Sequence, residues 1–315
     1  MAGGRLPGYT EVRPLGSGAS GSVVLATDDA TGAQVAIKFL SDAVVSGYGF
    51  LDRYEAEARL LAELSDPNLC RLLGYAPAAP AVVMEFIRGG SLRTILQSQG
   101  TLSVEASLVV LSSSLYGLAA AHAVGVMHRD HKPGNVLVDL DGRIHLTDAG
   151  ITVPLATKAK LMGAPAYLAP ERWAGGPATA ASDVYAASAV FVECLAGLPP
   201  YAGDDPAATG IKHEQAPPPM AAVPPSLRGI LARGLAKDQH LRPSDGRLLA
   251  AELAAIAVAD YGPGWERRGR AELAHAAAVV AAATQPRPAG ARRSRPLRAS
   301  RWRRRRGATR PESVG

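Results

Sequence analysis

Short β-branched runs separated by turn signals open the chain. Two of these runs, at residues 23–26 and 35–37, flank the sequence Asp-Asp-Ala-Thr-Gly at 28–32, a pattern that predicts a β-hairpin. A third short apolar run, at 81–87, is followed by the pair Gly89-Gly90, which breaks it. The first part of the chain is therefore expected to be rich in strands.

Helical periodicity appears at residues 50–64 and then dominates the chain after residue 90. Ser91 is a suitable N-cap for a helix that begins at Leu92. A strand-rich part followed by a helical part predicts an α+β fold of two lobes, an N-lobe at about 9–87 and a C-lobe at about 88–255. The longer helices are expected at 103–124, 182–196, 226–235 and 244–253.

Composition agrees with a globular protein of one bilobal domain or two domains. The chain has 315 residues, of which 47% are hydrophobic and 20% are charged. Cys70 and Cys194 lie far apart in apolar surroundings, so we expect buried thiols of a reducing compartment rather than a disulfide. We find neither a secretory leader nor an apolar run of the roughly 20 residues that a membrane span needs, and expect a cytoplasmic protein.

Charge divides the chain near residue 255. Residues 256–315 hold 14 Arg and four acidic residues, a net charge of +10, whereas residues 1–255 hold 20 basic and 24 acidic residues, a net charge of −4. Residues 256–284 are Ala-rich and predict a helix, and the Arg-rich residues 285–315 predict a disordered tail. Arg301 to Arg306, with Trp302 among them, could bind nucleic acid or anionic lipid, or could simply be a solvated end.

The stretch VMHRDHKPGNVLV at residues 126–138 carries the most specific chemistry. It places Asp130, Lys132 and Asn135 within six residues in an apolar setting. One loop can then present a base, a cation and a metal-ligating amide to a single phosphoryl group.

A second motif, G-x-G-x-x-G-x-V, runs from Gly16 to Val23. Dinucleotide-binding folds use a similar spacing, but there the glycines open a helix, whereas here a β-branched run and a hairpin follow. The loop is then a strand-loop-strand flap over phosphates, and a plain Gly-rich turn is the alternative.

Lys38 ends the strand V-A-I-K, and Glu57 shares a helical face with the apolar Tyr54 and Leu61. A carboxylate in an apolar stripe needs a partner. We expect Lys38 to be that partner and to hold the α- and β-phosphates; a misplaced helix face is the alternative.

Together these motifs resemble the Hanks-type (eukaryotic-type) serine/threonine protein kinases, in their bacterial branch, over about residues 9–253. The resemblance implies transfer of the γ-phosphoryl group of ATP to Ser/Thr hydroxyls of proteins, including this chain itself, which would involve self-association. Asp130 is then the catalytic base, Lys132 contacts the γ-phosphate, and Asn135 and Asp148 bind Mg²⁺, or in its place Mn²⁺.

The resemblance also implies the nucleotide site. Met84 lies at the back of the adenine pocket, and Glu85 to Ile87 form the hinge whose backbone binds adenine. The full set is Leu15, Gly16, Ser17, Gly18, Ala19, Ser20, Gly21, Val23, Ala36, Lys38, Met84, Glu85, Ile87, Asn135, Leu137 and Asp148.

Three further residues fit the same resemblance as supports of the site. Glu171 of Ala169-Pro170-Glu171 is expected to pair with Arg242, and Asp183 is expected to brace the catalytic loop.

Two positions depart from the family pattern. Asp148-Ala149-Gly150 lacks the usual Phe, whose burial contributes roughly 1.5–3 kcal/mol, and Ala164 replaces a threonine that contacts the catalytic aspartate. Our hypothesis is that Ala149 keeps basal activity low. Thr152 and Thr157 are the candidate phosphorylation sites that Arg129 would recognise, or else ordinary loop residues.

An ATP-dependent protein kinase is the leading interpretation, because every group needed for transfer is retained. A pseudokinase, or a weakly active nucleotide-binding scaffold, is the alternative and rests on Ala149 and Ala164. The protein substrate, the upstream signal and the oligomeric state are not encoded in any of these motifs.

Overall fold

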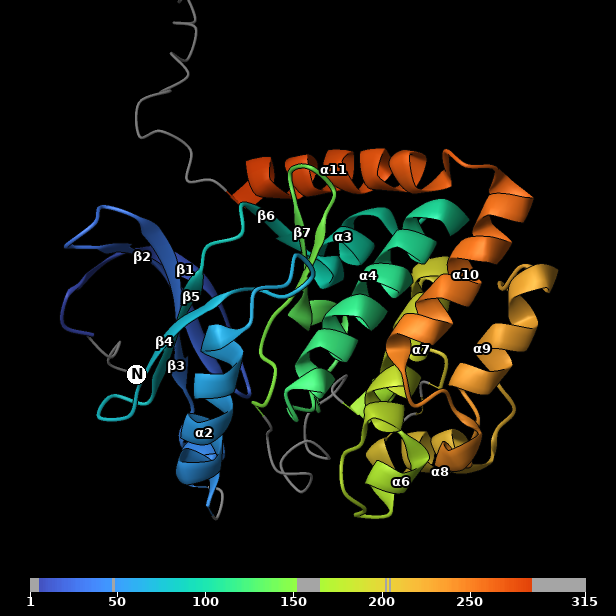
Figure 1. The fold of residues 1–315 in the computed structure, drawn as a ribbon, viewed down its shortest axis with the longest axis horizontal. Coiled ribbons are helices and arrows are strands. Elements are labelled where there is room, and N and C mark those ends of the chain that lie inside the picture. Colours follow the sequence, from blue (N-terminus) through green and yellow to red (C-terminus); the bar gives the residue numbers. More distant parts are fainter. Residues whose placement is uncertain (1–5, 47–48, 152–164, 202, 204, 285–315) are drawn as a thin grey trace, which may run out of the picture. The chain divides into compact units, whose positions relative to one another are not determined.

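Figure 1 shows the fold of the chain in a computed structural model. The structure describes residues 6–46, 49–151, 165–201, 203 and 205–284. The predicted Arg-rich tail at 285–315 lies outside the described residues.

A five-stranded antiparallel sheet with the order β1-β2-β3-β5-β4 forms the N-lobe. The predicted hairpin joins β2 to β3, where Thr27 pairs with Gln34 and Gly32 adopts a φ of 73° that favours glycine. The strands are β1 (Tyr9–Gly18), β2 (Gly21–Asp28), β3 (Gln34–Leu40), β4 (Leu72–Ala76) and β5 (Ala81–Glu85).

Two helices accompany this sheet, α1 (Asp42–Val45) and α2 (Phe50–Glu63). The face of α2 that the periodicity predicts is the buried one, since Tyr54 and Ala58 pack with Phe50 into the core beside β4. This orientation brings the same face of α2, which includes Glu57, toward the C-lobe.

Helices arranged around α4 (Val104–Ala123) build the C-lobe (Figure 1). Among the described residues α4 is also the one helix long and apolar enough to cross a membrane, but most of it is buried inside the protein, as in a core helix. A small sheet, β6-β7-β8, lies on this lobe. The remaining strands and α-helices of the described residues are β6 (Gly89–Ser91), β7 (Val136–Asp139), β8 (Ile144–Leu146), α3 (Leu92–Gln99), α6 (Pro170–Trp173), α7 (Ala180–Ala196), α8 (Pro206–Gln215), α9 (Arg228–Gly234), α10 (Gly246–Tyr261) and α11 (Trp265–Thr284).

Hydrophobic cores are separate in the two lobes, which confirms the predicted α+β bilobal fold. One large cluster unites the C-lobe helices, and two smaller clusters cover the two faces of the N-lobe sheet. Ser91 caps α3 as predicted, because its hydroxyl accepts a hydrogen bond from the backbone of Thr94.

The last two helices continue the C-lobe past residue 255. α10 runs on to Tyr261, and α11 buries Trp265, Leu273 and Val280 in the same core cluster as α4. The compact unit therefore includes α11 and reaches Thr284.

Candidate active site

A cavity of about 490 Å³ lies at the junction of the β1–β2 flap, the hinge and the catalytic loop. This volume is in the range of small-molecule sites. All sixteen residues that we assigned to the nucleotide site line it.

The flap over this cavity is a β-hairpin, which decides between the interpretations of the Gly-rich motif. β1 and β2 pair as far as Gly18 opposite Gly21, and a strand rather than a helix follows. Gly21 has a φ of 138°, and a Cβ there would lie 1.9 Å from the carbonyl oxygen of Phe39. Glycine at this position therefore lets β3 approach closely, while Gly16 and Gly18 line the cavity.

Lys38 lies on β3 with only 2% of its surface exposed. Its Nζ donates to Oδ2 of Asp148 at 2.6 Å. Asp148 itself adopts a φ of 67°, an unusual backbone conformation for a non-glycine residue. The two charged residues that should hold the phosphates and the metal are thus brought together and bonded to each other.

Glu57 does not pair with Lys38, so our prediction of that ion pair was wrong. Both of its carboxylate oxygens accept hydrogen bonds from the guanidinium of Arg129, each at 2.6 Å. The helix face was placed correctly, because the Glu57 side chain is only 12% exposed and points to the catalytic loop. The error lay in the choice of cation, because Arg129 offers a bidentate geometry that Lys38 cannot match.

The catalytic loop holds its three polar residues in one hydrogen-bonded group. Lys132 Nζ donates to Oδ2 of Asp130 at 2.6 Å, and the Asn135 side-chain amide donates to the Asp130 carbonyl oxygen at 2.8 Å. A short 3₁₀ turn at Pro133–Asn135 brings the amide back to the aspartate. The spacing of the motif is therefore what fixes the position of the Asp130 carboxylate.

Asp183 supports this loop, as predicted. Its carboxylate accepts the backbone N–H groups of His128 at 2.8 Å and Arg129 at 2.9 Å, and it contacts Nε2 of His122 at 2.8 Å. Burial by itself would raise the pKa of Asp183, but these donors outweigh it and leave the pKa below the usual range. Asp183 is therefore a charged brace that holds Arg129 in its left-handed backbone conformation, with a φ of 67°.

Two histidines of the loop are buried and neutral. Burial lowers the pKa of His128, and burial together with the neighbouring His128 lowers the pKa of His131 to about 3. Their ring centroids lie 5.7 Å apart. This packing supports a structural role for His128.

Asn135 and Asp148 line the same cavity and offer hard oxygen ligands. Mg²⁺ is commonly held by one or two protein ligands together with substrate phosphates and water. The donor set therefore fits a divalent cation that arrives with a nucleotide.

Comparison with known proteins agrees with this geometry. Residues 9–254 match the protein kinase domain family. The chain is 33% identical to the serine/threonine-protein kinase PknA of Mycobacterium tuberculosis over 309 residues, which cover 91% of this chain and 72% of PknA. It is 33% identical to PknA of Corynebacterium glutamicum over 263 residues, which cover 79% of this chain and 56% of that protein.

This chain belongs to the protein kinase family. The crystal structure of the PknI kinase domain of Mycobacterium tuberculosis has a similar fold, with a TM-score of 0.67 and 28% identity over 82% of this chain and 99% of that one. With relatives that are bacterial serine/threonine kinases and with the transfer residues retained, the chain is a Hanks-type serine/threonine protein kinase.

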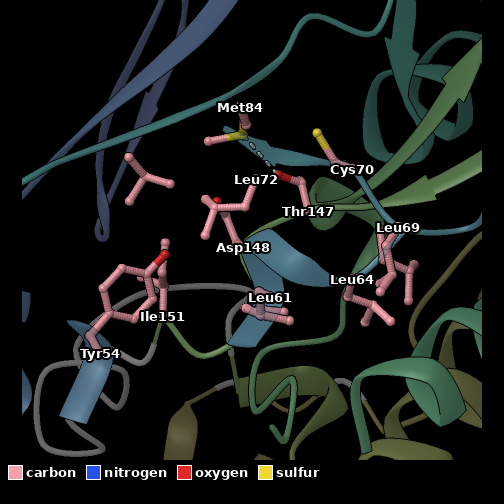
Figure 2. A pocket seen from close by; sticks show the side chains of 13 residues that line it. Tyr54, Leu61, Leu64, Leu69, Cys70, Leu72, Met84, Thr147, Asp148 and Ile151 are labelled. Carbon is pink, nitrogen blue, oxygen red and sulfur yellow. Dashed lines mark hydrogen bonds between the residues drawn. The ribbon is translucent and has the colours of Figure 1, made fainter. Parts of the chain in front are cut away.

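The kinase lacks the Phe that usually follows the metal-binding aspartate, and a cavity of about 40 Å³ lies beside Ala149 (Figure 2). In Figure 2 the Tyr54 and Ile151 side chains lie on one side of this cavity and Met84 on another. A cavity of roughly 150 Å³ is known to bind benzene, and the space beside Ala149 is far smaller than that. A Phe at position 149 would therefore have to displace neighbouring side chains.

The end of the activation segment is held as predicted. Arg242 donates two hydrogen bonds to Glu171, both at 2.8 Å, and only 4% of Arg242 is exposed. Burial acts to raise the pKa of Glu171, but hydrogen bonds from Arg242 and Ser182 outweigh it and lower the pKa. Ala164, Thr152 and Thr157 lie outside the described residues.

Several residues of the nucleotide cavity were not predicted. Gly89, Gly90 and Ser91 begin one residue after the hinge and could have been found from that position. Val280 and Thr284 are distant in sequence and carry no local signal. The other unpredicted residues of the cavity are Arg13, Thr94, Gly134 and Thr147.

Proposed function

We propose that this kinase uses ATP with a divalent cation, Mg²⁺ above all, and transfers the γ-phosphoryl group to Ser/Thr hydroxyls of proteins and of its own chain. The observation that carries the proposal is the single cavity lined by the Gly-rich flap, Lys38, Lys132, Asn135 and Asp148. Phosphoryl transfer depends on positioning and on charge stabilisation more than on covalent catalysis.

Each retained residue has a definite role in this reaction. Asp130 accepts the proton of the substrate hydroxyl, and Lys132, bonded to it, stabilises charge on the phosphoryl oxygens. Asn135 and Asp148 hold the metal ion, which neutralises phosphate charge when it is bound. Lys38 binds the phosphates nearer the sugar.

Productive binding requires two ion pairs to change partners. Lys38 is bonded to Asp148, and Glu57 is bonded to Arg129. In an active protein kinase the lysine of this strand pairs with the glutamate of this helix. We infer that the described arrangement is a resting state, and that the nucleotide with its metal draws Asp148 away from Lys38.

The test is transfer from labelled ATP with Mg²⁺ to the protein itself and to a generic basic acceptor. Asp130→Asn should abolish the label on Ser and Thr. Asp141→Asn is the matched control, because that carboxylate is 75% exposed on the surface. Nucleotide binding without transfer would instead identify a pseudokinase, and absence of both would refute the proposal.

The sequence also supports two separate proposals. The first is a cytoplasmic location. The second is that residues 285–315, which hold 11 Arg and one acidic residue, bind anionic partners. Binding of nucleic acid or of anionic vesicles by the full chain should weaken steeply as salt rises and should be lost when the Arg residues of 301–306 are replaced by Gln.

A further inference from the structure

Helix α11 lies beyond residue 254, where the match to the protein kinase domain ends, yet it is built into the C-lobe. In Figure 1 it is the orange-red helix that runs beside α3, β6 and β7. It contacts α4, β6, α3 and β7, and its buried residues belong to the C-lobe core. The helix is therefore an integral part of the kinase unit.

Close backbone contacts fix the first half of α11. A Cβ on Gly269 would lie 2.5 Å from the carbonyl oxygen of Glu105, and a Cβ on Gly142 would lie 2.0 Å from the carbonyl oxygen of Arg270. Glu272 accepts a hydrogen bond from the backbone N–H of Ser103 at 2.9 Å. These contacts leave the helix little freedom to slide or rotate.

The second half of α11 reaches the nucleotide cavity. Val280 packs against Gly90 of β6, where an added Cβ would lie 2.7 Å from the Val280 Cγ1 atom. Val280 and Thr284 both line the cavity of about 490 Å³, together with Ser91. The Thr284 hydroxyl can donate to the carbonyl oxygens of Val280 and Ala281, at 3.2 and 3.1 Å, so it serves its own helix.

We propose that α11 forms a wall of the ATP site at its nucleoside end, so that affinity for the adenosine part of ATP depends on the docking of α11. This inference rests on the proposed use of ATP. The phosphates belong at Lys38, Asp148 and the flap, whereas β6, which α11 touches, directly follows the hinge. Val280 and Thr284 therefore contribute shape at the base and sugar rather than charge at the phosphates.

The first test narrows the cavity from the side of α11, in the full chain. Thr284→Trp should weaken binding of ATP and of adenosine by roughly 5- to 100-fold, the equivalent of a steric penalty of about 1–3 kcal/mol. Val279→Trp is the matched control, because Val279 is 47% exposed and is not among the residues that line the cavity. Binding of Mg²⁺-tripolyphosphate, a probe without a nucleoside, should be unchanged by Thr284→Trp.

The second test uses the contact between α11 and β6. Gly90→Ala should weaken adenosine binding by about fivefold or more because the new methyl group overlaps Val280. Val280→Ala in the same chain removes the overlapping Cγ1 atom, so the double variant should return to within about threefold of the wild type. Thermal unfolding shows whether each variant is folded. If Gly90→Ala does not fold, Thr284→Trp still tests the inference, because Thr284 lies at the exposed end of the helix.

Each outcome decides the inference. If Thr284→Trp and Val279→Trp bind adenosine like the wild type, or if tripolyphosphate binding falls as much as adenosine binding, α11 is not a wall of the nucleoside site. If the wild type itself binds no ATP, the proposed function fails and the inference fails with it. Loss confined to the nucleoside probes, with rescue by Val280→Ala, would establish the wall.

Discussion

The Glu57 carboxylate is bonded to Arg129, and we expect it to be able to exchange this partner for Lys38. Its Oε2 atom lies 2.8 Å from where a Cβ on Gly150 would be, two residues after Asp148. Asp148 is in turn bonded to Lys38. The Lys38 ammonium has three N–H donors, so once turned toward Glu57 it can serve both carboxylates.

Arg129→Met tests this exchange by removing both hydrogen bonds to Glu57 while keeping the apolar stem. The Glu57 and Arg129 side chains are 12% and 16% exposed, and loss of one partner from a buried pair costs about 3–5 kcal/mol. If Glu57 turns to Lys38, the Arg129→Met variant loses less stability than these roughly 3–5 kcal/mol. If Lys38→Met is also present, only the half-exposed Arg53 remains near Glu57, with its Nε 4.0 Å from Oε1, so most of the cost returns.

The prediction is therefore that the double variant loses more stability than the two single variants together, by about 1–3 kcal/mol. Urea unfolding at pH 7 measures the free energy of unfolding without requiring activity, and equal slopes for the four proteins would validate the comparison. Additivity within roughly 0.5 kcal/mol would refute the exchange. Arg233→Met is the control in the same cycle, because its pair with Glu252 is half-exposed, worth about 0.2–1 kcal/mol, and should add independently to Lys38→Met.

Three other predictions concern the activation segment and the cavity beside Ala149. Arg242→Met should lower the free energy of unfolding by about 3–5 kcal/mol and the melting temperature by roughly 6–20 °C, far more than Arg233→Met. A shift in melting temperature as small as that of Arg233→Met would contradict a stabilising role for the buried pair. Because the folded-state pKa of Glu171 is lowered, its contribution to stability is present above the unfolded pKa near 4.5 and is lost as the pH falls through the lower folded value. The difference in melting temperature between the wild type and Arg242→Met should therefore shrink between pH 7 and pH 3. Ala149→Phe should leave the free energy of unfolding within about 2 kcal/mol of the wild type, because burial of the ring is offset by overpacking. The same variant should raise turnover severalfold by reordering Tyr54. Unchanged turnover would count against a role for Ala149 in low basal activity.

Contacts within one loop, or within one recognised motif, were predictable from the sequence. Asp130, Lys132 and Asn135 are so close along the chain that a single short turn must bring them together. The pair between Glu171 and Arg242 followed from the family resemblance. In both cases the sequence left little choice of partner.

Contacts that depend on the relative position of two elements were harder to predict. Glu57 was placed on the correct face, but which cation it meets depends on how α2 sits against the catalytic loop. The change of charge near residue 255 pointed to a domain boundary before α11. The packing of α11 against the C-lobe depends instead on small residues. Gly269, Ala276 and Ala277 give little hydrophobic signal, yet they allow the close approach that joins the helix to the C-lobe.

The resting ion pairs link nucleotide binding to assembly of the active site. Lys38 and Lys132, the two lysines that should meet phosphates, are each held by a carboxylate at 2.6 Å. Asp148 can release Lys38 without leaving a buried charge unpaired only when another cation takes its place. A nucleotide that arrives with a divalent metal brings that cation and also a new partner for the lysine, so it favours the exchanged arrangement through differential affinity. A nucleotide without metal offers Lys38 a partner but leaves Asp148 uncompensated, and we therefore expect metal to strengthen nucleotide binding in this kinase as well as its catalysis.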